Sequence, residues 1–259
     1  MSRVLHELAL PTFQRFADAW GYEVSAIDLP RDGRGADPLA QAAKWAKVQM
    51  LRGALQDYDT VLWVDADVLI LRTDEDVAAH LRPGDFQALA LEQVPAEHRV
   101  NPNTGVWLLS GPGGGDFLDA VDRLGPQPGP WSDQGAVLAA LGWDLGNEQH
   151  HGARPGVVSR FLLRTSWLPT GWNQPFVVGR SASDCFNSSV ASYLDRPRVP
   201  APFALHFMGL TPEARFRHMS SHADTVGVCR PSSGAAPMAA PPRGGGGVSD
   251  LRAAAPTAR

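Results

Sequence analysis

Two stretches near the N-terminus carry apolar residues at helical spacing. Within residues 11–20, Phe13, Phe16 and Ala17 recur every three or four positions, and Gly21 follows as a helix stop. A second stretch covers residues 38–56, and its apolar stripe consists of Leu39, Ala43, Ala46, Met50, Leu51 and Leu55. Both patterns predict amphipathic helices that pack one face against a core.

The most apolar run in the chain is TVLWVDADVLIL, at residues 60–71. A continuous run of Val and Leu between polar residues is typical of a strand that is covered on both faces of a sheet. Further strands are predicted at residues 23–29, 87–91, 105–110, 157–163 and 203–207, and further helices at 116–124 and 132–141. The alternation of helices and strands predicts crossover units and an open α/β sheet.

The two ends of the chain depart from this pattern. A crossover sheet normally opens with a strand before its first helix, but residues 3–10 make a poor strand, so the opening strand is expected to be missing or degraded. From about Arg230 the sequence is rich in Pro, Gly and Ala and has no aromatic residue. We therefore expect one domain over residues 1–229 and a disordered tail over 230–259.

The composition favours one domain and argues against some partners. The chain has 259 residues, 44% of them hydrophobic, which is enough for one large core. Lys and Arg number 23 against 27 Asp and Glu, a net charge of -4 that makes nucleic acid and acidic membranes unfavourable partners. Only Lys44 and Lys47 are lysines, and the abundance of Ala, Gly and Pro is typical of a high-GC bacterial gene.

The sequence has no pattern that predicts a membrane span, a leader or a cysteine framework. The run at residues 60–71 is interrupted by aspartates and is shorter than the roughly 20 residues of a membrane helix. The N-terminus lacks the apolar core of a signal peptide, so we expect a cytoplasmic protein. Cys185 and Cys229 match neither a zinc site nor a disulfide framework.

Asp65 and Asp67 stand two positions apart at the end of the predicted strand. Because side chains alternate along a strand, we expect both carboxylates on the same side, outside the sheet edge where α/β proteins bind ligands. Neighbouring carboxylates repel unless they are protonated, solvated or shared by a cation, and oxygen ligands favour Mg²⁺ or Mn²⁺. The pair alone is equally compatible with carboxylates that are satisfied by backbone or water.

Five motifs in a fixed order resemble a GT-A fold nucleotide-sugar glycosyltransferase. They are WAKVQMLRGALQDYDTVLWVDADVLI at residues 45–70, NTGVW at 103–107, SDQ at 132–134, LP with WN at 168–173 and HFMG at 206–209. The set is most similar to the retaining family of fungal α-galactosyl- and mannosyltransferases and plant xyloglucan xylosyltransferases, in its short bacterial form. This resemblance implies a Rossmann-like open mixed sheet, mostly parallel, with helices on both faces.

The resemblance also implies a role for each motif. The metal ligands, which bind Mn²⁺ or Mg²⁺ across the diphosphate of a nucleotide sugar, are Asp65, Asp67 and His206. The donor-binding residues are Lys47, Asp65, Asn103 and Thr104. The catalytic residues that face the transferred sugar are Asp133 and Gln134, and the acceptor side includes Trp172 and Asn173. The metal would stabilise the negative charge that develops on the leaving diphosphate.

Several of these residues also have a structural explanation. Taken alone, His206 is typical of a core histidine, but its place in HFMG after the other motifs favours a metal ligand. Lys47 is otherwise a solvated helix lysine, Asn103 a turn residue and Asp133 a helix cap. Trp172 fits an acceptor wall or core packing equally well. Three further tryptophans are expected in the core: Trp63, Trp107 and Trp143.

The sequence therefore predicts a metal-dependent glycosyltransferase that moves a hexose or pentose from a nucleoside-diphosphate donor to an acceptor hydroxyl. Retention at the anomeric carbon follows from the resemblance alone. A truncated, non-catalytic nucleotide- or carbohydrate-binding homologue is the alternative, suggested by the missing opening strand. A haloacid-dehalogenase-type phosphotransferase, which also has an apolar strand ending in DxD, is less favoured because Leu69 replaces its usual Thr or Val and both lysines precede Asp65.

Overall fold

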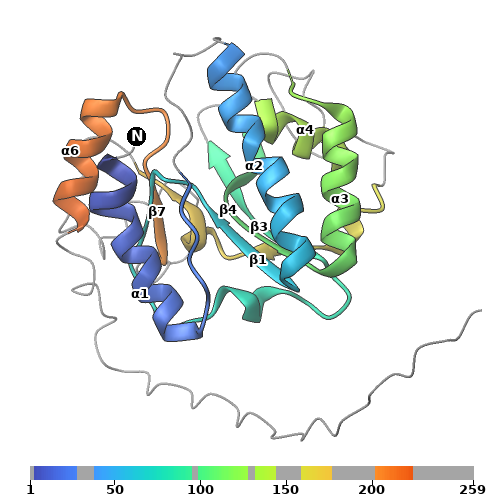
Figure 1. The fold of residues 1–259 in the computed structure, drawn as a ribbon, viewed down its shortest axis with the longest axis horizontal. Coiled ribbons are helices and arrows are strands. Elements are labelled where there is room, and N and C mark those ends of the chain that lie inside the picture. The colour runs from blue at the N-terminus through green and yellow to red at the C-terminus, as the bar shows by residue number, and fades with distance from the viewer. Residues whose placement is uncertain are drawn as a thin grey trace, which may run out of the picture.

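The structure is a computed structural model, shown in Figure 1. It describes residues 3–27, 38–94, 99–127, 132–143, 159–176 and 202–223. The predicted tail at residues 230–259 lies outside the described residues, as does the start of the strand predicted at 157–163. Among the described residues, no helix is both long and apolar enough to pass through a bilayer.

The N-terminal segment is helical, as its apolar spacing predicts, but it begins earlier than expected. A π-helical stretch, η1 (Val4–Ala9), leads directly into α1 (Leu10–Trp20). Gly21 ends α1 in the left-handed conformation, with φ of 76°, and its N–H donates to the carbonyl of Ala17 at 2.7 Å. The predicted strand at residues 23–29 is wrong for its described part, 23–27, which has no regular structure and in which the carboxylate of Glu23 accepts from the hydroxyl of Tyr58 at 2.8 Å.

The remaining predicted helices and most predicted strands are present. The helices are α2 (Pro38–Asp57), α3 (Gly111–Leu124), α4 (Ser132–Ala140) and α6 (Pro212–Ala223), with 3₁₀ turns η2 (Val77–His80), η5 (Leu162–Arg164) and η6 (Thr170–Asn173). The strands are β1 (Thr60–Val64), β2 (Val68–Ile70), β3 (Gln87–Val94), β4 (Arg99–Ser110), β5 (Thr165–Leu168), β6 (Gln174–Pro175) and β7 (Ala204–His206). Helix α6 and strands β5 and β6 were not predicted.

The larger sheet has four strands in the order β1-β4-β3-β5. Strand β4 runs antiparallel to both of its neighbours, and only β3 and β5 form a parallel pair. The prediction of a mixed α/β sheet is confirmed, but the prediction that it is mostly parallel is wrong for these hydrogen-bonded pairs. The reason is that β4 turns back directly beside β3 and inserts between β3 and β1, where a crossover would have placed a parallel strand.

The apolar run at residues 60–71 forms two strands, where the pattern predicted one. Strand β1 belongs to the larger sheet, while β2 belongs to a smaller sheet of order β2-β7-β6. Residues Asp65 to Asp67 lie in the turn between them. The two aspartates therefore stand at the point where the chain passes from one sheet to the other.

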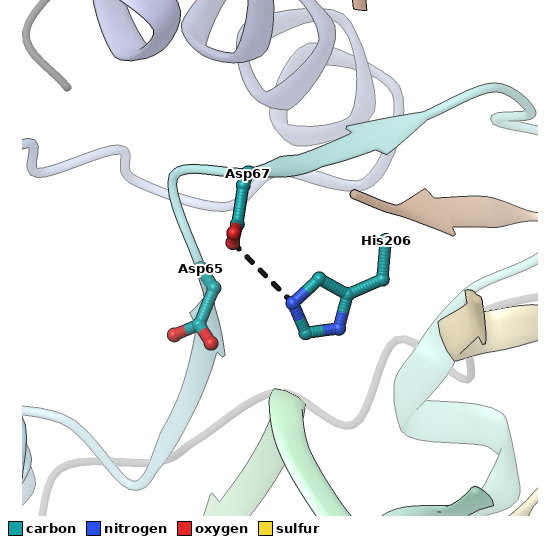
Figure 2. Close-up of side chains that lie close together, drawn as sticks. All are labelled: Asp65, Asp67 and His206. Atoms are coloured by element: carbon teal, nitrogen blue, oxygen red, sulfur yellow. Dashed lines mark ion pairs between the residues drawn. The ribbon is translucent and has the colours of Figure 1, made fainter. Parts of the chain in front are cut away.

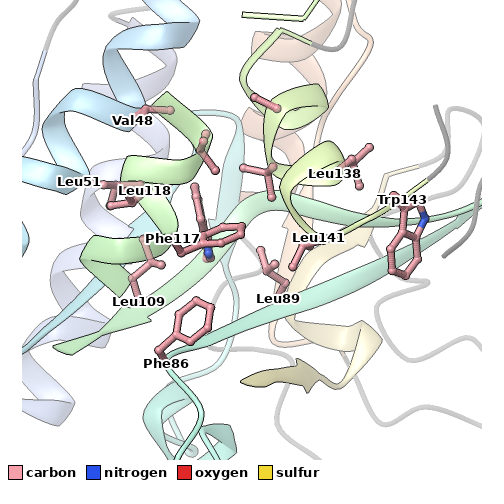
Figure 3. Close-up of a cluster of buried hydrophobic side chains, with 14 residues drawn as sticks. Val48, Leu51, Phe86, Leu89, Leu109, Phe117, Leu118, Leu138, Leu141 and Trp143 are labelled. Atoms are coloured by element: carbon pink, nitrogen blue, oxygen red, sulfur yellow. The ribbon is translucent and has the colours of Figure 1, made fainter. Parts of the chain in front are cut away.

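Both faces of the larger sheet are buried. Successive residues of β3 and β4 point to opposite sides, so each strand contributes side chains to two separate cores. Leu89 and Trp107 face α2, α3 and α4, whose side chains form the core drawn in Figure 3. Ala88 and Leu108 face the other side, where the smaller sheet and α1 cover them. Helices were predicted on both faces. Helices α2, α3 and α4 cover one face, whereas a second sheet together with α1 covers the other.

The smaller sheet has its own outer cover. Leu69 of β2 points away from the larger sheet and joins Phe207 and Met219 in a third apolar cluster with η1 and α6. Figure 1 shows α1 and α6 side by side on this flank, away from α2, α3 and α4. Helix α6 is therefore fixed next to the end of β7.

The strand predicted at residues 157–163 is wrong in its described part, which forms a turn followed by η5. The hydroxyl of Ser159 donates to the carbonyl of Ala140 and accepts from the N–H of Phe161, so this segment turns before Thr165 begins β5. Leu163, which resembled a strand residue in the sequence, is 67% exposed.

Two leucines of α3, one in the middle of the helix and one at its last position, test how the core contributes to stability. Leu118 is fully buried and Leu124 is 46% exposed. We expect Leu118→Ala to lower the free energy of unfolding by about 2–5 kcal/mol, because it leaves a cavity under the sheet. Leu124→Ala, the matched control, should change it by no more than about 0.5 kcal/mol. Urea denaturation followed by circular dichroism measures both free energies. Equal losses in the two variants would contradict the placement of Leu118 in the core.

Candidate metal centre

Asp65 and Asp67 are held by a turn whose two ends belong to different sheets. The N–H of Asp65 donates to the carbonyl of Gly105 in β4 at 2.8 Å, and the carbonyl of Asp67 accepts from the N–H of Phe207 at 2.8 Å. The N–H of Val68 closes the turn on the carbonyl of Asp65 at 3.0 Å. This turn brings the two carboxylates together. The sequence predicted their proximity from the alternation of side chains along a strand, which does not apply because both residues lie outside the strands.

His206 completes a group of three side chains at this turn. It is the last residue of β7 and pairs in register with Val68, the first residue of β2. One ligand atom each from Asp65, Asp67 and His206 lies within 4.8 Å of the others. Figure 2 shows the three side chains gathered at this turn. The imidazole Nε2 is 3.3 Å from Oδ1 of Asp67. The three residues assigned to a metal from the sequence therefore meet, although about 140 positions separate His206 from the aspartates.

Lys47 is buried beside Asp65 and is not the solvated helix lysine that the sequence left open. Its Nζ lies 3.0 Å from Oδ1 of Asp65 and 3.5 Å from Oδ2 of Asp133, and donates to the carbonyl and hydroxyl oxygens of Thr104 at 3.0 and 3.1 Å. Burial alone would lower the pKa of Lys47, but the two carboxylates outweigh it and raise the pKa. Lys47 therefore remains charged and neutralises part of the acidic cluster.

Arg215 forms an ion pair with Asp67, as Lys47 does with Asp65. Its Nε lies 3.3 Å from Oδ2 of Asp67 and donates to the carbonyl of Phe207 at 3.1 Å. Burial raises the pKa of Asp67, but the hydrogen bond and charge of His206, followed by the charge of Arg215, lower it to about 2. Asp67 is thus ionised at neutral pH, which is the form that binds a cation. Sequence reasoning missed Arg215 because it lies on α6, a helix that was not predicted.

Asn103 and Asn173 form a buried hydrogen-bonded chain behind His206. Oδ1 of Asn103 accepts from the N–H of Gly105 at 2.8 Å and from Nδ2 of Asn173 at 2.7 Å. Oδ1 of Asn173 then lies 2.9 Å from Nδ1 of His206. Asn103 was predicted to bind the donor and Asn173 the acceptor. The structure places these amide contacts within the protein, on the far side of the imidazole from Asp67.

Four tryptophans were given roles from the sequence, and Trp63 alone departs from its predicted burial. Trp107 and Trp143 are buried as expected, but Trp63 is only partly buried, and its indole N–H donates to Oδ1 of Asp65. Trp172 is 1% exposed, its ring stacks on Phe203 at 4.7 Å between centroids, and it packs in the core between the sheets. Core packing, one of the two explanations left open for Trp172, is the one that the structure supports.

Asp133 and Gln134 lie in the first turn of α4 and are partly buried. The carboxylate of Asp133 faces Lys47, which connects it to Asp65. The predicted residues Lys47, Asp65, Thr104 and Asp133 are therefore connected through the Lys47 ammonium group. Gln134 follows Asp133 within the same turn.

Comparisons with known proteins assign no family by sequence. No model of a known protein family matches the chain, and no curated protein matches it. Its shape is similar to that of several solved glycosyltransferases, each 14% identical in sequence. One, which is involved in glycosylation of the major capsid of PBCV-1, has a TM-score of 0.47 and covers 84% of this chain and 91% of its own. Mouse xyloside xylosyltransferase 1 has a TM-score of 0.40 with 82% and 74% covered, and the galactosyltransferase LgtC 0.36 with 71% and 66%.

At this identity and with TM-scores below 0.5, these likenesses assign no activity to the chain. What the described residues establish independently is a mixed α/β architecture and an Asp-Asp-His group that can hold a metal ion. The function therefore has to be argued from the residues of this centre.

Gly105 gives a direct test of the geometry of the centre. A Cβ at this position would lie 2.4 Å from Cε1 and 2.6 Å from Nδ1 of His206, so alanine cannot fit beneath the imidazole. We expect Gly105→Ala to displace the ring and to weaken Mn²⁺ binding by at least about tenfold, the scale seen when a ligand loses its support. Electron paramagnetic resonance of free Mn²⁺ measures the affinity.

The control for this variant is Gly53→Ala, because a Cβ at Gly53 meets no atom within 4 Å. It should bind Mn²⁺ like the wild type. Wild-type affinity in Gly105→Ala would show that the position of the His206 ring does not matter for the metal.

Proposed function

We propose that this chain is a metal-dependent glycosyltransferase that moves a sugar from a nucleoside-diphosphate donor to an acceptor hydroxyl with retention at the anomeric carbon. The observation that carries the proposal is the meeting of Asp65, Asp67 and His206 at one turn. These are the residues that the ordered motifs of the sequence assign to a metal in such enzymes. Neither the motifs nor the spatial cluster depends on the other, and both select the same three side chains.

The chemistry of the three side chains fits Mn²⁺ or Mg²⁺. Two carboxylates and one imidazole supply oxygen and nitrogen ligands, and three protein ligands leave coordination positions for a substrate. Lys47 and Trp63 both contact Oδ1 of Asp65. Asp67 is ionised, as a metal ligand has to be.

The charges around the centre favour a multiply charged anion once a cation is bound. Three carboxylates, from Asp65, Asp67 and Asp133, face two cationic side chains, Lys47 and Arg215, which leaves one negative charge when His206 is neutral, the form that binds a metal. A divalent cation reverses this to one positive charge. A diphosphate group supplies the negative charge that such a site attracts.

In this proposal the chain's own residues hold the reacting groups in place. Lys47 holds the carboxylate of Asp65 in place, and Arg215 does the same for Asp67, so neither has to reorganise as negative charge develops on the leaving diphosphate. The bound cation supplies Lewis-acid stabilisation of that charge. In a front-face reaction the departing phosphate oxygen takes the proton of the acceptor hydroxyl, so the chain needs no separate base.

The side of the centre formed by Lys47, Thr104 and Asp133 is the proposed donor side. These residues contact one another beside Asp65, which supports a common role. Gln134, next to Asp133 in the first turn of α4, completes the part that would face the transferred sugar. Trp172 is excluded from the acceptor side of this proposal because its side chain is covered.

The metal centre is tested by removing one ligand at a time. We expect Asp67→Asn and His206→Gln to weaken Mn²⁺ binding by more than about 100-fold, a larger effect than that of residues behind the ligands. Isothermal titration of the full chain with Mn²⁺ measures this, and circular dichroism confirms the fold. Asp74→Asn, which changes an exposed carboxylate outside the centre, is the matched control. Unchanged titration in both ligand variants would reject the assignment.

The transferase activity is tested with a panel of UDP- and GDP-sugars. In the presence of Mn²⁺ we expect slow release of the nucleoside diphosphate from one donor, because transferases of this kind use water when no acceptor is present. Release should stop when the metal is chelated and in Asp67→Asn. Metal-dependent binding of a donor without release would support the non-catalytic homologue, and no binding of any donor would contradict the proposal.

A further inference from the structure

We propose that Asn103 and Asn173 are positioning residues that fix the tautomer of His206 through a hydrogen-bonded chain anchored on the backbone of Gly105. This proposal rests on the proposed metal centre, because it concerns how one of its ligands is prepared. It replaces the sequence-based roles of these two residues in contacting the donor and the acceptor.

The orientation of the first amide is set by the backbone. The N–H of Gly105 can only donate, so the atom of Asn103 that lies 2.8 Å from it has to be the amide oxygen. The amide nitrogen of Asn103 then points to the sulfur of Met208, at 3.9 Å. Because main-chain atoms of β4 hold this contact, Asn103 cannot rotate by exchanging its oxygen and nitrogen without losing it.

The second amide follows from the first. The oxygen of Asn103 accepts, so the atom of Asn173 at 2.7 Å from it has to be the donating Nδ2. Oδ1 of Asn173 consequently faces His206, where it lies 2.9 Å from Nδ1. An amide oxygen has no proton to give, and Nδ1 of His206 therefore has to carry one.

This assignment leaves Nε2 as the metal-binding nitrogen. Nε2 faces Asp67 at 3.3 Å, and its proton is the one that a bound cation would displace, which leaves a lone pair on Nε2 while Nδ1 keeps its proton. The other tautomer would place its only proton on the side of the metal and leave two acceptors facing each other at Nδ1. Metal-bound histidines commonly have their second nitrogen held in this way, which fixes the ring orientation as well as the tautomer.

Burial strengthens the hydrogen bonds that link the two amides to His206. Asn103, Asn173 and His206 are 3%, 2% and 5% exposed, so water has little access to replace a lost partner. The absence of a side chain at Gly105 leaves the space that the ring occupies, since a Cβ there would overlap it. The same residue thus makes room for the imidazole and supplies the N–H that orients the chain behind it.

The test compares two substitutions of Asn173. Asn173→Leu keeps the size of the side chain but cannot accept from Nδ1, whereas Asn173→Asp keeps an accepting oxygen. We expect Asn173→Leu to weaken Mn²⁺ binding by about 10–100-fold. Asn173→Asp keeps the oxygen that accepts from Nδ1 but cannot donate to Oδ1 of Asn103, so its affinity for Mn²⁺ should lie between those of the wild type and Asn173→Leu. Gln174→Leu, which removes the neighbouring buried amide, is the control and should have no effect.

A spectroscopic readout separates positioning from general damage. In full-length protein labelled with ¹⁵N-histidine, with and without Zn²⁺ as a diamagnetic probe, His206 should show a proton bonded to Nδ1 in the wild type and in Asn173→Asp. The signal is assigned by its loss in His206→Gln. In Asn173→Leu this proton should be lost or exchange rapidly while the other histidine signals remain.

The outcomes are distinct from those of the transferase assays because no sugar donor is used. An Nδ1-bound proton that depends on Asn173 supports the proposal even if no donor is hydrolysed, and if Mn²⁺ then fails to bind the wild type, the proposed metal centre fails while the tautomer assignment stands. A proton on Nε2 alone in the Zn²⁺-loaded wild type would overturn the proposal. Wild-type Mn²⁺ affinity in folded Asn173→Leu would overturn it as well.

Discussion

The structure depends on a constraint between two like charges. The carboxylates of Asp65 and Asp67 lie in the single turn that carries the chain from the larger sheet to the smaller one, and partial burial makes their repulsion costly. Lys47 from α2 and Arg215 from α6 each neutralise one of them, from opposite flanks of the molecule. The two halves of the fold are therefore joined at the same place where the charge has to be balanced.

The same arrangement explains why the centre has a defined geometry before any ligand binds. Backbone hydrogen bonds attach Asp65 to β4 and Asp67 to the residue after β7, so each sheet fixes one carboxylate. His206 is held by β7 and by the amide chain behind its ring. Rigid strands and buried hydrogen bonds place all three ligands, which is the kind of support that metal sites need.

The sequence predicts which three residues meet at the centre better than it predicts their surroundings. Strongly periodic segments such as residues 38–56 gave correct helices, and ordered motifs identified Asp65, Asp67 and His206.

Helix α6 was missed because its sequence, PEARFRHMSSHA, lacks an apolar stripe and is stabilised by contacts of Met219 with distant residues. The break between β1 and β2 was missed because a buried turn between two apolar strands has the same hydrophobic pattern as one strand. The amide chain could not be predicted, since it depends on side-chain contacts across 70 and 33 positions.

The central claim is that one divalent cation binds between residues of the two sheets. Crystals grown with Mn²⁺ and measured at the manganese absorption edge locate the ion directly by its anomalous scattering. We expect one strong peak within direct coordination distance of a carboxylate oxygen of Asp65, a carboxylate oxygen of Asp67 and Nε2 of His206. A structure in which Mn²⁺ is bound elsewhere, with no ion in contact with Asp65, Asp67 and His206, would contradict it.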